Sequence, residues 1–263
     1  MKTLAFLFCL LISLNSTAQG IIDGFIDNPK AKALALSISH ESSDTYFLWN
    51  RDLDLPISSF TASLFYKHQL TKNLGYVASI PFINGTPQDG SLFLKYGVGR
   101  EITKNFKINA IAAFGGSHPL SNYSTESSKA IGQQAKSIGF RTVAQLTFKN
   151  TLFINGRFGM NFNSHPTPDN TVASIKIGFY KNKWYADFWI DRIEADGGKD
   201  YRGLGDNKAE SFRELGFDAD RVGGVVYHQT SPKIGLFISG SYTINGRNAY
   251  KISRVSGGAV WKF

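Results

Sequence analysis

The sequence has little cysteine and no long hydrophobic run, and these two shortages exclude several classes of protein. The chain of 263 residues contains one cysteine, Cys9, close to its start. If this residue is removed with a leader, the mature chain has no disulfide framework, no thiol nucleophile and no cysteine-ligated metal. Beyond the leader, no segment approaches the ~20 apolar residues that a membrane-spanning helix needs.

The first eighteen residues have the pattern of a secretory signal peptide. Lys2 supplies the positive charge, the segment 4–14 is apolar, and Ser16, Thr17 and Ala18 are the small residues of a cleavage site. We therefore expect an exported protein whose mature chain begins at Gln19.

The rest of the chain is long enough for one domain. Residues 19–32 contain Gly, Asp and Pro and are predicted to form a periplasmic lead-in, while residues 33–263 form a single β domain. The formal net charge of +9 can indicate a nucleic-acid partner. The lysines recur in predicted turns rather than in one patch, so we expect no nucleic acid to bind.

Apolar residues alternate with polar or small residues from position 33 onward, which is the period of a β-strand. Twelve strands are predicted, at 33–40, 58–70, 74–83, 91–98, 106–115, 138–148, 152–162, 173–180, 184–191, 222–229, 234–242 and 255–263. The polar segments 41–56, 116–136 and 192–221 are predicted loops.

The last predicted strand has one apolar face, which ends in Trp261 and Phe263, while Arg254 and Ser256 lie on the opposite face. A strand that ends in Trp-Lys-Phe resembles the closing strand of a bacterial outer-membrane barrel. In such barrels aromatic residues form a girdle at the membrane interface. We expect Trp261 and Phe263 to lie in this girdle and to be recognised by the barrel assembly machinery.

Short and long connections alternate along the predicted strands. The dipeptide Lys-Asn occurs at four tight joints, and Asn tolerates the left-handed backbone that short turns need. These joints lie at 72–73, 104–105, 149–150 and 181–182, and Ser231-Pro232 forms a fifth. The other connections are mostly longer and polar.

Alternating faces, alternating loop lengths and an even strand number predict an all-β fold, a single antiparallel transmembrane barrel of twelve strands with both termini periplasmic. The predicted location is the outer membrane, with outer-membrane lipid and lipopolysaccharide around the barrel. A soluble β-sandwich or a lipocalin-like barrel is the alternative, because either can be built from alternating strands.

Charged and aromatic side chains recur on the face predicted to line the lumen. The candidates are Lys67, Lys95, Lys107, Arg141, Arg157, Lys176, Asp187, Asp191 and Trp189. They can form a cationic pore lining that selects solutes by charge. Alternatively, Asp187 and Asp191 pair with neighbouring cations and fill a narrow barrel. The sequence leaves both interpretations open.

Catalytic and metal sites have little support. The acidic loop 192–221 does not match the spacing of a calcium-binding loop. An outer-membrane hydrolase would need His and Ser on adjacent positions with an orienting group. The pairs Ser117-His118 and Ser164-His165 lie in loops, and no Ser partner can be placed for His40, His68 or His228. We therefore expect no catalytic residue, no metal and no cofactor.

Four short motifs, at 23–25, 37–42, 79–82 and 246–248, resemble a group of Bacteroidetes-type outer-membrane proteins. This group is related to the meta-pathway phenol-degradation barrel family. The resemblance implies an outer-membrane barrel for solute transport with no established catalytic residues. The chain departs from it in the charged loop 192–221.

The function predicted from the sequence is a passive channel for a small solute, either hydrophobic or aromatic, or anionic. A closed structural barrel without transport and an outer-membrane hydrolase are the alternatives.

Overall fold

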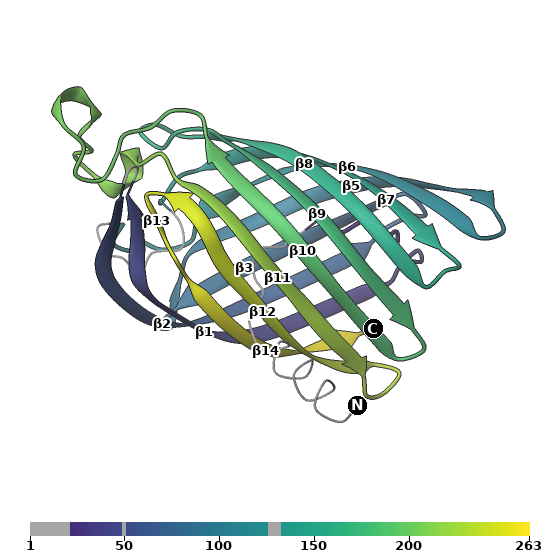
Figure 1. Ribbon diagram of the computed structural model, residues 1–263. Helices are drawn as coiled ribbons and strands as arrows, with labels where there is room; N and C mark the ends of the chain where they lie inside the picture. The colour runs from purple at the N-terminus through teal and green to yellow at the C-terminus, as the bar shows by residue number, and fades with distance from the viewer. Residues whose placement is uncertain (1–21, 49–50, 126–132) are drawn as a thin grey trace, which may run out of the picture.

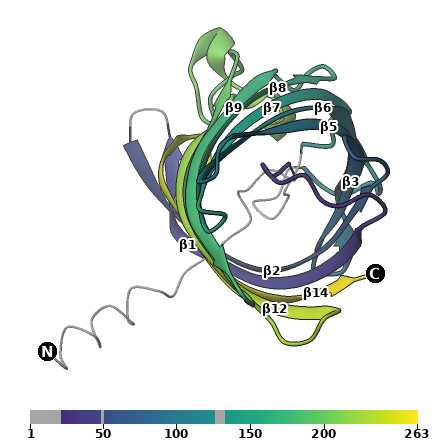
Figure 2. The same cartoon turned by 90° about the vertical axis from the view of Figure 1, so that its right-hand side faces the viewer.

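The computed structural model describes residues 22–48, 51–125 and 133–263, and their strands close into one antiparallel barrel (Figures 1 and 2). The twelve long strands are β1 (Lys32–Leu48), β2 (Arg51–Gln69), β3 (Leu74–Ile83), β5 (Asp89–Thr103), β6 (Phe106–Pro119), β7 (Ser137–Phe148), β8 (Leu152–Asn163), β9 (Asn170–Lys181), β10 (Trp184–Ala195), β11 (Asp218–Gln229), β12 (Ile234–Arg247) and β14 (Ser253–Lys262). Each pairs with its neighbours in the chain, and β1 pairs with both β2 and β14. Closure gives each of these strands a neighbour on both sides, as a barrel in lipid requires. The Arg51–Phe60 end of β2 pairs with β1 alone, because the β2–β3 pairing begins at Thr61.

The two faces of the barrel are the reverse of those of a soluble barrel. Outward positions are apolar and exposed; for example, Phe140, Phe158, Ile177, Phe188 and Leu236 are 43–52% exposed. Inward positions carry polar and charged side chains, many of them buried. This arrangement corresponds to a transmembrane barrel and not to the soluble alternative.

Short turns lie at one end of the barrel and longer loops at the other. At the short-turn end, Lys149, Asn150 and Asn182 adopt the positive φ angles predicted for the Lys-Asn joints, whereas the joints at 72–73 and 104–105 do not. The longest described connection, residues 196–217, lies at the opposite end from Phe263 (Figure 1). None of the helices in the described ranges is long and apolar enough to cross a membrane.

Three predicted loops are shorter in the structure because the strands continue into them; in the loop predicted at 116–136, β6 extends to Pro119. The prediction of a loop at 41–56 is wrong: β1 and β2 extend as a hairpin, with Tyr46 opposite Leu53. The polar residues of this hairpin suggested a loop, but strands above the lipid need no apolar outward face.

Strands β10 and β11 likewise take both ends of the predicted loop 192–221, which leaves residues 196–217. This mouth loop contains two 3-10 helices, Gly205–Asn207 and Phe212–Glu214. Two short strands that the sequence did not predict, β4 (Thr86–Pro87) and β13 (Ala249–Tyr250), pair with β3 and β1.

Aromatic pairs ring the outer face near the short turns. Ring centroids lie 5.0 Å apart for Phe106 and Phe148, and 4.3 Å apart for Trp184 and His228. Outward Trp261 lies in register with Leu34 of β1. This ring has the composition and position of an interfacial girdle.

Candidate functional site: the lumen and its N-terminal segment

Residues 22–31, here called the luminal segment, lie inside the ring of strands (Figure 2). The sequence predicted a periplasmic lead-in at 19–32 and gave no sign that its residues enter the lumen; the periplasmic side stays a prediction. The segment has no strand periodicity, and the contacts that hold it are long-range. It is tied to the wall where it joins β1, because Lys30 donates a backbone hydrogen bond to Gln69.

Apolar contacts anchor the luminal segment to two sides of the barrel. Ile22 is 4% exposed and packs in a cluster with Val77, Phe93 and Val143, which belong to β3, β5 and β7. Phe25 makes an edge contact with Phe153 of β8, with the ring centroids 5.2 Å apart. Burial of these side chains favours a docked segment.

Ion pairs hold the same segment through its two aspartates. Asp27 accepts a hydrogen bond from Lys67 at 2.7 Å. Asp23 pairs with Lys95, whose ammonium also donates to the Phe25 carbonyl at 2.6 Å. Two cations predicted to line the lumen are therefore bound to the segment.

Gly24 is needed where the segment passes closest to the wall. A Cβ at Gly24 would lie 2.3 Å from the side-chain oxygen of Gln145. Asn109 donates a 3.0 Å hydrogen bond to the Gly24 carbonyl. Any larger residue at position 24 would have to displace Gln145, which is 1% exposed.

The remaining predicted acids are paired within the wall. Lys176 and Asp187 lie 3.2 Å apart, and Asp191 receives two hydrogen bonds from Arg221. Glu41, in the segment predicted to be a loop, faces inward on β1 and pairs with Arg254. The sequence-based count of inward acids was too low because it missed this residue and the two aspartates of the luminal segment.

Lys107, Arg141 and Arg157, here called the cationic wall, lie on the adjacent strands β6, β7 and β8. None of the three forms an ion pair within the described ranges. Arg141 instead donates to the carbonyl of Met160 and to Asn161, at 2.8 and 2.6 Å. The excess positive charge of the lumen is thus concentrated on one side.

The predicted luminal aromatics mainly fill space. Trp189 is 1% exposed, and Phe153 stacks against Tyr185 with the ring centroids 5.8 Å apart. Phe93 belongs to the cluster around Ile22. These contacts favour the packing interpretation over a free aromatic path through the barrel.

The mouth loop is fixed to the end of β12. Asp200 accepts a 2.6 Å hydrogen bond from Arg247, and Asn248 donates to Asp200 and to the Gly216 carbonyl. Burial alone would raise the pKa of Asp200, but hydrogen bonds from Arg247, Asn207 and Asn248 outweigh it and lower that pKa. Arg247 and Asn248 belong to the motif at 246–248, whose role the sequence did not reveal.

One serine–histidine contact corrects the expectation that His40 has no Ser partner. On the outer face, His40 Nε2 and Ser58 Oγ lie 3.1 Å apart. In the described ranges, no carboxylate or amide orients the other ring nitrogen. Those ranges also contain no group of three or more His, Cys, Asp or Glu that could hold a metal ion.

The two terminal aromatics lie outside the lumen. Trp261 is 36% exposed and Phe263 is 71% exposed, and the Phe263 backbone N–H donates to the Lys32 carbonyl. Their recognition by the barrel assembly machinery stays a prediction.

These features define a class: the closed, twelve-stranded antiparallel barrel of outer-membrane proteins. An outer-membrane channel from Pseudomonas putida F1 has a similar fold, with a TM-score of 0.71, 13% identity and coverage of 92% of this chain and 98% of that chain. The NanC porin follows with a TM-score of 0.56, 11% identity and coverage of 88% and 100%. The KdgM porin has a TM-score of 0.51, 7% identity and coverage of 87% and 99%. The sequence matches no protein-family model and no curated protein.

Proposed function

We propose that the chain is a passive outer-membrane channel for small anionic solutes, narrowed by its luminal segment. The observation that carries the proposal is the cationic wall, whose three side chains form no ion pair within the described ranges, whereas Lys67, Lys95, Lys176, Arg221 and Arg254 are each paired with an acid. Charges lining a water-filled tube with low-dielectric walls focus the potential and attract counter-ions. A twelve-stranded lumen is wider than the eight-stranded barrels that side chains alone can fill.

The similar folds of two porins and an outer-membrane channel support this proposal, as does the inward placement of the charged residues. The signal peptide, the outer-membrane location and the Bacteroidetes-type affinity belong to the same proposal. We place the short turns and both termini on the periplasmic side, and the mouth loop outside the cell. Alternating loop lengths and the aromatic ring near the short turns support this orientation.

Reversal potentials across a salt gradient in planar bilayers test the proposal. We expect the wild-type channel to prefer anions, because Lys107, Arg141 and Arg157 attract them. The double variant Arg141→Gln, Arg157→Gln should lose most of this preference, whereas Lys72→Gln, in an exposed turn, should retain it. A cation-selective wild type, or no conductance in repeated reconstitutions, would instead support the closed structural barrel.

A further inference from the structure

The outer face of the barrel is hollowed across strands β5 to β12. The hollow, here called the outer groove, has a volume of about 1120 Å³. Its floor consists of small outward residues on four adjacent strands, Ala110, Ala112, Ala144, Gly156 and Ala173. A Cβ at Gly156 would meet no atom within 4 Å, so the space over the floor is open.

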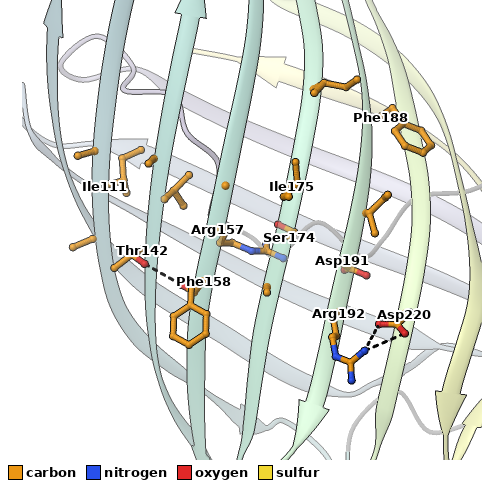
Figure 3. Close-up of a pocket in the computed structure, with 18 of the residues that line it drawn as sticks. Ile111, Thr142, Arg157, Phe158, Ser174, Ile175, Phe188, Asp191, Arg192 and Asp220 are labelled. Atoms are coloured by element: carbon orange, nitrogen blue, oxygen red, sulfur yellow. Dashed lines mark hydrogen bonds and ion pairs between the residues drawn. The ribbon is translucent and has the colours of Figure 1, made fainter.

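Bulky apolar side chains flank this floor. Figure 3 shows Phe158 on one flank and Phe188 on another, with Ile175 between them. The lining is almost wholly apolar, and it faces the hydrocarbon of the membrane. Such a surface favours binding of hydrocarbon chains that stay in the groove rather than exchange freely with the surrounding lipid.

A polar cluster closes the groove at its loop-side end. Arg192 donates to Asp220 at 3.2 Å (Figure 3). It also donates to Glu194 at 3.0 Å. Asn245 also donates to Asp220. Arg192 is about half exposed, so its guanidinium remains accessible, and the cluster presents both signs of charge to the membrane surface.

We propose that the outer groove binds a phosphorylated, multiply acylated glycolipid of the outer leaflet. The acyl chains occupy the groove, and a phosphate contacts Arg192. Asp220 and Glu194 face a divalent cation carried by that phosphate, since such cations prefer oxygen ligands. The volume exceeds the ~300–1,000 Å³ of pockets that hold one small ligand, which favours several chains over one.

The choice of the outer leaflet rests on the orientation in the proposed function, but the binding site itself does not depend on conduction. Two outward glycines provide a matched pair of variants. Gly156 lies in the groove floor, whereas Gly257 lies on β14, where an added Cβ would meet only the Phe237 carbonyl oxygen, at 3.9 Å. Leucine at either position projects into open space, so both variants should fold.

The experiment titrates delipidated, purified barrel with hexa-acylated, bisphosphorylated lipid A in the presence of Mg²⁺, followed by native mass spectrometry. Gly156→Leu should weaken binding at least tenfold, and Gly257→Leu less than twofold. Arg192→Gln should weaken binding several-fold and abolish any preference for bisphosphorylated over dephosphorylated lipid. The conductance of Gly156→Leu should match that of the wild type. A failure of the proposed channel function can therefore be distinguished from a failure of the proposed lipid binding.

Three results would overturn the proposal. The first is an equal effect, or no effect, of the two glycine variants. The second is binding of phosphatidylethanolamine with the same affinity and the same dependence on Gly156, which would identify an ordinary phospholipid. The third is a wild-type dimer that Gly156→Leu dissociates, which would make the groove an interface between two copies of the chain.

Discussion

Lys176 and Asp187 are held deep in the barrel wall, with side chains 9% and 0% exposed. Tyr185 adds a hydrogen bond to the same carboxylate. Removal of one partner from a buried pair leaves an uncompensated charge, which costs far more than the pair itself contributes. The pair therefore stabilises the wall where β9 and β10 meet, whichever solute the barrel admits.

We expect Lys176→Gln to lower the free energy of unfolding by about 3–5 kcal/mol, the range for breaking a buried ion pair. Urea unfolding in detergent micelles, followed by tryptophan fluorescence, measures the change. Lys72→Gln, in an exposed turn, is the control and should have almost no effect. An equally small effect of both changes would show that Asp187 does not need its lysine.

Phe188 tests the assignment of the outer face. A basic residue on the lipid face near the bilayer midplane costs about 2–4 kcal/mol. Phe188→Arg should therefore lower the unfolding free energy by about this amount in liposomes, whereas Phe188→Leu should have little effect. A harmless Phe188→Arg would mean that this position does not face lipid.

Much of this residue-level information was predictable from strand periodicity. Because side chains alternate, correct strand register fixed the outward position of Phe188 and the inward position of Asp187. The pairing of each charge was not predictable, because partners such as Glu41 and Arg254 lie far apart in the sequence. The outer groove was not predictable either, because its small residues lie on four strands that become neighbours only in the folded sheet.

At the scale of single elements, the strands were predicted and the luminal segment was not. Lipid requires a periodic apolar face, and that requirement is visible along each strand. The luminal segment is irregular and meets its partners across the interior, so no local pattern reports its position. Its aspartates pair with Lys67 and Lys95, which are themselves on predicted luminal faces.

The two ion pairs predict how the luminal segment limits conduction. The double variant Asp23→Asn, Asp27→Asn should weaken docking, because Lys67 and Lys95 lose their carboxylates. We expect a larger and noisier single-channel conductance in planar bilayers. Asp52→Asn, in the exposed β1–β2 hairpin, should leave the conductance unchanged. An unaltered conductance in the double variant would show that Ile22 and Phe25 suffice to hold the segment.

For the whole molecule, the end with short turns and the end with the mouth loop differ in chemistry. The short-turn end has paired aromatics on its outer face, whereas the mouth loop is fixed by a polar network around Asp200. The lowered pKa of Asp200 means that this network contributes stability above the ordinary carboxyl pKa and loses it as the pH falls through the lowered value. The mouth loop should thus stay ordered at any pH near neutrality.

The orientation of the barrel can be tested with single cysteines, because the only native cysteine, Cys9, lies in the predicted signal peptide. Leu204 is 90% exposed in the mouth loop, and Lys72 lies in a short turn at the other end. In intact cells, a membrane-impermeant maleimide should label Leu204→Cys and spare Lys72→Cys. After the outer membrane is permeabilised, both variants should react, which controls for accessibility of the turn. Labelling of Lys72→Cys alone in intact cells would invert the barrel and place the mouth loop in the periplasm.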